Sequence, residues 1–223
     1  MILRNDLYPQ MMAKLEAVGM QNEPAKLIGI RNEDGQKDDL LNDFLLHCTD
    51  GKNVFLSLGT TDPGIHARIS HPEGPAHMCL GLHKQIWVIG THAKSNPAFA
   101  HEALCSRSDR GCQPVKYWRD RNKDFIYSIG DDIQADPDAG INMHRASKCS
   151  DIKQIGLYFE GCQGRIRASD HEAMMDAIKK VPKVAATHFK GTNQHRFWQE
   201  EPGADYWAYL FSYLLTLKTE WKL

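Results

Sequence analysis

The chain has 223 residues, a formal net charge of −1, and ordinary fractions of hydrophobic (42%) and charged (25%) residues. These values exclude a disordered or fibrous chain, and the length is sufficient for one domain with its own core. A charge so close to zero gives no support for a broad surface that binds nucleic acid or anionic membranes. No apolar run is long enough to cross a bilayer, so we expect no stable membrane insertion.

The first half of the chain is predicted to contain one helix and several short strands. Residues 7–18 carry apolar side chains at helical spacing, which predicts a peripheral helix within residues 1–20. The run 39–48 fits a helix or a strand, and the Asp-Pro-Gly sequence within 59–64 predicts a turn. Short apolar runs bounded by turn residues predict strands at 26–30 and 54–58 and a strand pair at 78–82 and 85–89.

The second half is again dominated by predicted strands. One helix is expected over 170–181, with Asp170 as its N-cap and Pro182 at its end. The predicted strands are 114–118, 141–144, 155–159 and a closing strand at 211–217, and the third of these should deliver Gly161 and Cys162. The whole pattern predicts a single strand-dominated α+β domain over residues 1–223, with helices packed on its outside.

Cys162 is the strongest candidate for a catalytic residue. A cysteine attacks as the thiolate, so it needs a base or a positive partner, and backbone N–H groups to stabilise the oxyanion. Gly161 permits a sharp turn and the close approach of a substrate carbonyl. The apolar run that ends in His144 precedes Cys162, and the segment 146–160 between them is long enough to run out and return. Cys162, His144 and Gly161 are therefore the predicted catalytic residues.

The segment from Ile141 to Arg167 resembles the active-site motif of the L,D-transpeptidase (YkuD-like) family. In that family an apolar strand with histidine precedes Ser/Thr-x-Gly-Cys, an apolar residue, and arginine or asparagine. This sequence has Phe159 in place of the Ser or Thr and Gly164 in place of the arginine. Residues 60–64, 87–92 and 119–124 are similar to cell-wall-active proteins of phage and prophage origin.

The resemblance implies a fold and a substrate. The expected fold is a curved mixed sheet, a sandwich or barrel with peripheral helices, that holds the cysteine at the mouth of a groove. The expected chemistry is acyl transfer on the peptide stem of bacterial peptidoglycan through a Cys162 thioester. Arg145, Arg165 and His92 are the candidate substrate-binding residues.

Metal and cofactor sites are weaker candidates. Asp120, Asn122 and Asp124 begin a run over 120–131 that partly follows the spacing of a calcium loop. Its sixth position is Phe125, where such loops have glycine, so a solvated polar turn is the favoured interpretation. The six cysteines are expected to be reduced, since no export signal precedes them. We expect no cofactor and no resident metal.

Three functions remain open at the level of sequence. The first is a peptidoglycan peptidase of the endolysin type, made in the cytoplasm and acting on the cell wall after phage-mediated release. The second is an L,D-transpeptidase that forms peptidoglycan cross-links. The third is a non-catalytic protein of the virion or one that binds the cell wall. The sequence leaves the oligomeric state and the bond that is cut undetermined.

Overall fold

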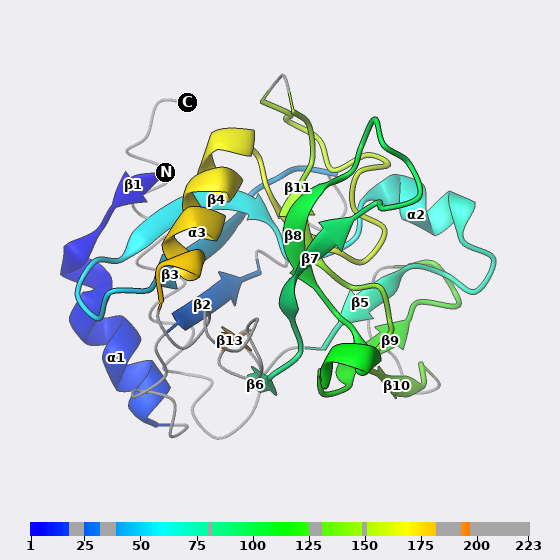
Figure 1. Cartoon of the computed structure of the whole chain (residues 1–223). Helices are drawn as coiled ribbons and strands as arrows, with labels where there is room; N and C mark the ends of the chain where they lie inside the picture. The colour runs from blue at the N-terminus through cyan, green and yellow to red at the C-terminus, as the bar shows by residue number, and fades with distance from the viewer. Residues whose placement is uncertain are drawn as a thin grey trace.

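The computed structural model describes residues 1–17, 25–31, 39–79, 82–124, 131–148, 151–181 and 193–196. Strands dominate this part of the chain, and a curled mixed sheet forms a half-barrel with few helices around it (Figure 1). The predicted strand-dominated α+β class is thus confirmed. None of the helices in these ranges is long and apolar enough to cross a membrane. The expected closing strand at 211–217 lies outside the described residues.

The large sheet has ten strands. Two neighbouring pairs, β13–β2 and β11–β12, are parallel, and β1 (Ile2–Leu3) joins β4 from outside the main order. The order is β6 (Leu82–Lys84), β13 (Asn193–Arg196), β2 (Ala25–Ile30), β3 (Asp43–Cys48), β4 (Phe55–Thr60), β12 (Gln163–Arg165), β11 (Met143–Arg145), β8 (His101–Cys105) and β7 (Val88–His92). A smaller antiparallel sheet contains β10 (Ile133–Asp136), β9 (Val115–Arg119) and β5 (Ala76–Met78).

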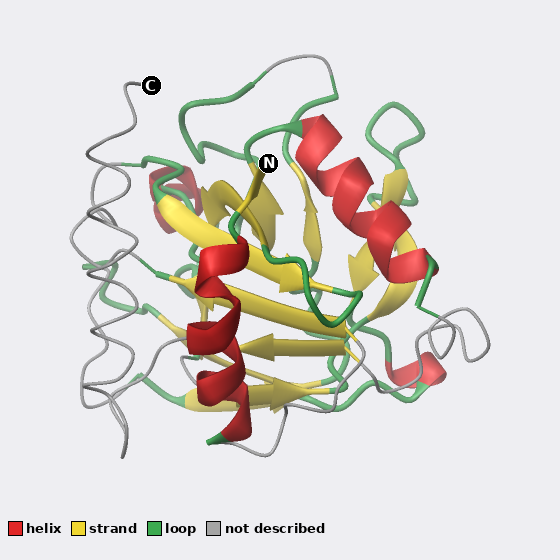
Figure 2. Ribbon diagram, turned by 90° about the vertical axis from the view of Figure 1, so that its left-hand side faces the viewer, coloured by secondary structure: helices red, strands yellow, loops and turns green. Residues whose placement is uncertain are grey.

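Two helices cover opposite faces of the large sheet. Side chains alternate between the faces of a strand, and β2 and β3 follow this rule. On one face, α1 (Tyr8–Glu16) packs its apolar side against the strands, as Figure 2 shows. On the other face lies α3 (Ala168–Lys179). The first cluster contains Leu7, Met11, Leu15, Ile28, Ile30, Phe44 and Leu46, and the second contains Leu27, Leu45, Trp87, Leu104, Met143, Met174 and Ile178.

Several predicted elements are confirmed. The helix expected at 7–18 is the short helical turn Asn5–Leu7 followed by α1, and the run 39–48 is a strand from Asp43 onward. The strands expected at 26–30, 54–58 and 114–118 are β2, β4 and β9. Elements that the sequence analysis did not predict include α2 (Ile65–Ser70), the 3-10 helix Ser108–Arg110, β8, β10 and β12.

The strand pair expected at 78–82 and 85–89 is wrong. The backbone of β5 pairs with β9 in the small sheet, while β7 pairs with β8 in the large sheet. Gln85 between them has a positive φ of 57°, and Trp87 turns into the core, where its indole N–H donates to the Ile141 carbonyl at 2.7 Å. The two apolar runs therefore belong to different sheets, a long-range choice of partner that local composition does not encode.

Two expectations near the site are also wrong. Residues 155–159 form turns, in which the Tyr158 N–H donates to the Ile155 carbonyl and Gly156 has a φ of +54°. Ile155 and Phe159 bury against Leu41 instead of entering a ladder, while Leu157 and Tyr158 are exposed. The strand of the site is β12, which follows Cys162 rather than preceding it. Asp170 does not cap α3, because the helix begins two residues earlier and its N-cap position is Arg167.

Candidate functional site

Cys162 directly precedes β12, the second strand of the parallel pair β11–β12. The register places Met143 opposite Gln163 and His144 opposite Gly164, so the strand with the predicted base lies beside the strand that follows the predicted nucleophile. Gly161 has a φ of +140°, and a Cβ atom there would lie 2.8 Å from the Ala76 carbonyl oxygen. Only glycine fits this conformation without strain, and the turn leaves Cys162 partly exposed.

The thiol of Cys162 is held by two backbone groups. Its Sγ donates to the Gly140 carbonyl at 3.3 Å and accepts from the Asn142 N–H at 3.4 Å. Burial raises the pKa of Cys162 to about 11, and the charge of Glu160 adds to this, while the Asn142 N–H opposes it. The resting side chain is therefore a neutral thiol at physiological pH.

His144 lies beside this thiol, and one of its ring nitrogens has a free lone pair. Its Nδ1 lies 2.8 Å from the Arg145 carbonyl oxygen, and a carbonyl can only accept, so Nδ1 carries the hydrogen and Nε2 the lone pair. Nε2 is buried without a hydrogen-bond partner among the described residues. A ring nitrogen of His144, one of His92 and Sγ of Cys162 all lie within 4.8 Å of one another. Burial, followed by the charge of His92, holds the pKa of His144 well below its ordinary value.

Three more histidines surround His144, and with it they form what we call the histidine group: His92, His101, His144 and His171. His92 ends β7 and His101 begins β8, and the two are directly paired across this hairpin. The His92 ring stacks on the His144 ring, with centroids 3.7 Å apart and an interplanar angle of 10°. The His101 centroid lies 5.8 Å from those of both His144 and His171. Burial lowers the pKa of His92 to about 4 and that of His171 to about 3.

The sequence analysis singled out His92 but not His101 or His171. A prediction of the β7–β8 hairpin would have placed His101 opposite His92, but the strand 101–105 was not recognised. His171 reaches the group from α3, where its Nε2 lies 2.9 Å from the Glu102 carbonyl oxygen. No local sequence signal connects that helix with the hairpin.

A cavity of about 190 Å³ adjoins the histidine group. Arg145 lines it, and no carboxylate among the described residues lies within ion-pair distance of this guanidinium. Lys179, by contrast, is paired with Glu102 at 2.8 Å and Asp176 at 3.0 Å. The lining residues are His101, Glu102, Arg145, His171, Glu172, Met175, Asp176 and Lys179.

Arg165, the other arginine predicted to bind substrate, is fully buried and lies away from this cavity. Its guanidinium donates to the Ser57 hydroxyl and to the Leu45 carbonyl, the latter at 3.4 Å, and lies 3.3 Å from Nδ1 of His47. Burial lowers its pKa to about 10. The structure thus brings His92 to Cys162 and His144, places Arg145 at the neighbouring cavity, and directs Arg165 into the interior.

Phe159 and Gly164 form one packing unit beside His144. The Phe159 ring lies 4.7 Å from the His144 ring, centroid to centroid, and is completely buried. Any side chain at position 164 would overlap the Phe159 ring. The two departures from the L,D-transpeptidase-like pattern therefore occupy the same space: the aromatic ring fills the volume that the glycine leaves.

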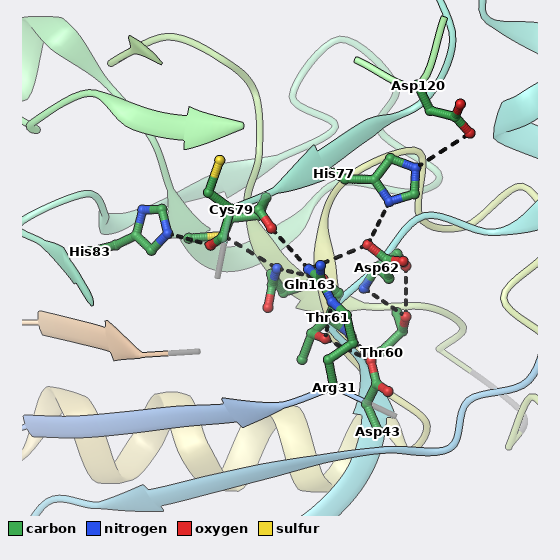
Figure 3. A network of polar contacts seen from close by, with 11 residues as sticks. Arg31, Asp43, Thr60, Thr61, Asp62, His77, Cys79, His83, Asp120 and Gln163 are labelled. Atoms are coloured by element: carbon green, nitrogen blue, oxygen red, sulfur yellow. Dashed lines mark hydrogen bonds and ion pairs between the residues drawn. The ribbon is translucent and has the colours of Figure 1, made fainter. Parts of the chain in front are cut away.

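A buried polar network, drawn in Figure 3, includes Gln163, the residue after Cys162. Gln163 donates to the Thr61 carbonyl at 3.0 Å. Arg31 donates to the same carbonyl at 2.7 Å and pairs with Asp62 at 3.3 Å. Burial raises the pKa of Asp62, but the Arg31 and His77 charges outweigh it, so the pKa lies below its ordinary value. The network fixes the end of β4 and the start of β12, which carry the site.

The calcium-loop candidates are only partly described. Asp120 is buried, and its Oδ1 accepts from the backbone N–H of Asp124 at 3.1 Å, while its Oδ2 lies 4.0 Å from Nε2 of His77. Asn122 donates to the Asp124 carboxylate at 3.0 Å in an exposed turn. Residues 125–130 lie outside the described ranges. Within those ranges, the group of histidine, cysteine and acidic residues that could hold a metal is His92, His144 and Cys162.

We compared the chain with models of protein families, with curated proteins and with solved structures, and none of these comparisons gave a match.

Proposed function

We propose that this chain is a cysteine-dependent peptidase that acts on the stem peptide or cross-link of peptidoglycan. The observation that carries the proposal is the closeness of a partly exposed thiol to a histidine whose free lone pair has no hydrogen-bond partner in the part of the chain that the structure describes. Sγ of Cys162 and a ring nitrogen of His144 lie within 4.8 Å, and the Arg145 carbonyl fixes the tautomer that leaves Nε2 free. In the resting structure the thiol donates to the Gly140 carbonyl rather than to His144, so Sγ must turn toward Nε2 before nucleophilic catalysis can begin.

The raised pKa of Cys162 and the lowered pKa of His144 favour a neutral resting pair. In the proposed reaction, Nε2 takes the thiol proton as Sγ attacks the carbonyl carbon of the substrate. The proton then passes to the leaving amine, the C–N bond breaks and a thioester remains. Water, deprotonated by the same nitrogen, attacks the thioester and releases the acid and the thiol.

The substrate class comes from the resemblance of residues 141–167 to the L,D-transpeptidase motif. Stem peptides carry free carboxylates, and the Arg145 guanidinium, which has no ion-pair partner among the described residues, lines the cavity beside the histidine group. An arginine binds a carboxylate with two parallel hydrogen bonds, which would orient the peptide. We therefore assign Arg145 and His92 to substrate binding, and we leave Arg165 out because it is buried elsewhere.

The first test is the loss of cleavage in active-site variants. Cys162→Ala should abolish the release of peptides from purified peptidoglycan, and His144→Ala should lower turnover by about 10²-fold or more. Cys112→Ala, which removes another thiol from the interior, is the matched control and should keep most activity. Wild-type turnover in Cys162→Ala would contradict the proposal. Circular dichroism of each variant should be unchanged.

A second test separates hydrolysis from cross-linking, which begin with the same thioester. Mass spectrometry of the digested peptidoglycan should show shortened or uncross-linked stem peptides. An excess of an amine acceptor should give no new cross-linked dimers, because the partly exposed Cys162 is open to water. New dimers that depend on Cys162 would instead identify a transpeptidase. Binding to peptidoglycan without any cleavage would favour a non-catalytic wall protein.

A further inference from the structure

We propose that His92, His144 and Cys162 also form a binding site for a borderline-soft divalent cation such as Zn²⁺, and that the bound ion blocks the nucleophile. Their ligand atoms all lie within 4.8 Å of one another. Cation binding stands on this geometry alone, whereas inhibition by the cation rests on the proposed peptidase function.

His144 has the hydrogen bonding of a metal ligand. Metal-binding histidines usually donate their second ring N–H to a carbonyl or carboxylate, which fixes the tautomer and the ring orientation. The Arg145 carbonyl accepts from Nδ1 at 2.8 Å in this role. Nε2 keeps its lone pair and is buried without a hydrogen-bond partner among the described residues, on a side chain that is 3% exposed. A cation would satisfy this atom.

His92 supplies a second imidazole that cysteine acylation does not need. The Ser106 N–H donates to Oδ1 of Asn142 at 3.0 Å, so the amide nitrogen of Asn142 must face His92, whose Nδ1 lies 3.2 Å away. Nδ1 therefore accepts this bond with the lone pair of the neutral ring. A cation would replace one neutral hydrogen bond, whose net contribution is only about 1 kcal/mol.

The spacing approaches that of a small tetrahedral ion, but the His92 and His144 rings are stacked with an interplanar angle of only 10°, so one ring must also tilt before both lone pairs can point at one cation. Bond lengths of about 2.0–2.1 Å for Zn–N and about 2.3 Å for Zn–S place tetrahedral ligand atoms roughly 3.4–3.6 Å apart. The three ligand atoms, which are at most 4.8 Å apart, need to approach one another by about 1.4 Å or less. The set of two nitrogens and one sulfur favours Zn²⁺ or Co²⁺ over Mg²⁺ and Ca²⁺, which prefer oxygen ligands. The fourth position is left for water.

The loss of one proton from Cys162 accounts for both metal binding and inhibition. The Cys162 thiol, which now donates to the Gly140 carbonyl, would lose its proton to solvent as the metal–sulfur bond forms. Sγ would then coordinate the metal and carry no proton that Nε2 of His144 could accept. The acyl-enzyme could not form until a chelator removed the ion.

Spectroscopy with Co²⁺ tests the site without any assay of activity. The reduced, chelator-treated chain is titrated with Co²⁺, and one equivalent should produce a thiolate-to-cobalt charge-transfer band and intense d–d bands typical of a tetrahedral site. Zn²⁺ should displace the Co²⁺, and Mg²⁺ should not. A titration without a thiolate band, or with the same bands in Cys162→Ala, would overturn the proposal.

Single substitutions test whether the imidazoles of His92 and His144 are both metal ligands. Replacing a hydrogen-bond partner of a ligand typically weakens metal binding by about 10–100-fold, so His92→Ala and His144→Ala should each lose at least about tenfold in affinity. His101→Ala is the matched control, because its ring lies 5.4 Å from His92 and 5.8 Å from His144 without belonging to the ligand set. It should bind as the wild type does. Unchanged affinity in His92→Ala would refute the three-residue site.

The outcomes separate this proposal from the peptidase. If the thiolate band forms but the metal-free chain cuts no peptidoglycan, the cation site stands and the peptidase fails. If the metal-free chain is active and Co²⁺ gives no thiolate band, the peptidase stands and the site fails. If both hold, stoichiometric Zn²⁺ should inhibit cleavage and a chelator should restore it. Activity that persists with bound Zn²⁺ would overturn the inhibitory role.

Discussion

At the scale of residues, the unusual feature of the site is its neutrality. A thiolate–imidazolium pair forms where the cysteine pKa is lowered by a positive partner. Here burial raises the pKa of Cys162 to about 11 and holds that of His144 well below its ordinary value. Both shifts favour the uncharged forms, so in the proposed reaction the histidine would take the proton during the attack rather than before it.

This neutrality predicts the pH dependence of thiol alkylation. The rate of Cys162 modification by iodoacetamide should rise about tenfold per pH unit from neutral pH toward pH 10, because only the thiolate reacts. Mass spectrometry of the peptide that contains Cys162 measures the rate, and the Cys162→Ala variant gives the background. A plateau of fast labelling between about pH 6 and pH 8 would instead indicate a preformed ion pair.

The pair Cys162–His144 could be proposed from sequence because the motif is local to residues 141–167. The role of Arg165 could not be judged in the same way. It stands three residues after the nucleophile, yet its guanidinium turns inward to Ser57 and His47, which come from strands far away in the sequence. Whether an arginine faces a groove or the core depends on these long-range neighbours.

At the scale of elements, strands with a strong apolar pattern were predictable, and short strands were not. The residues of β2, β4 and β9 have enough alternating apolar residues to be recognised. The residues of β12, Gln163 to Arg165, have no apolar member, and this strand exists because β4 and β11 provide ladders on both sides. Conversely, the apolar run 155–159 forms a turn, in which only Ile155 and Phe159 are buried, in a separate cluster with Leu41.

The packing of Phe159 over Gly164 gives a prediction at this scale. Gly164→Ala should destabilise the fold, because the new methyl group would overlap the Phe159 ring and lie 2.7 Å from the His144 carbonyl oxygen. Phe159→Ala should lower the free energy of unfolding by about 3–5 kcal/mol, because it leaves a cavity in the core. The double variant should be more stable than the sum of the two changes implies, with a coupling energy of about 0.5–3 kcal/mol.

Urea denaturation of the wild type, the two single variants and the double variant measures this coupling. Gly140→Ala is a suitable control in both backgrounds, since its Cβ atom would have no neighbour within 4 Å and the strain from the φ of +70° does not involve Phe159. Gly140→Ala should lower the free energy of unfolding by the same amount in the wild type and in Phe159→Ala. Additive effects of the changes at 159 and 164 would show that the ring does not occupy the space above the glycine.

At the scale of the whole molecule, buried histidines link stability to pH. Burial lowers the pKa of six described histidines, in the core and in the histidine group: His47, His83, His92, His101, His144 and His171. In the unfolded chain each returns to an ordinary value near 6.5 and binds a proton in mild acid. The free energy of unfolding should therefore be greatest above pH 6.5 and fall as the pH is lowered.

The contribution of a single histidine to this pH dependence can be measured at His171. Its pKa falls from 6.5 unfolded to about 3 folded, so between these values only the unfolded state binds the proton. From about pH 5.5 to about pH 4.5, this group should remove about 1.4 kcal/mol of stability per pH unit. In His171→Gln, whose amide can still donate to the Glu102 carbonyl, the slope of unfolding free energy against pH should decrease by that amount. Urea denaturation across the pH range measures the slope. At pH 8, where the imidazole is neutral in both states, no difference in slope is expected. A slope in mild acid equal to that of the wild type would show that His171 is protonated in the folded protein.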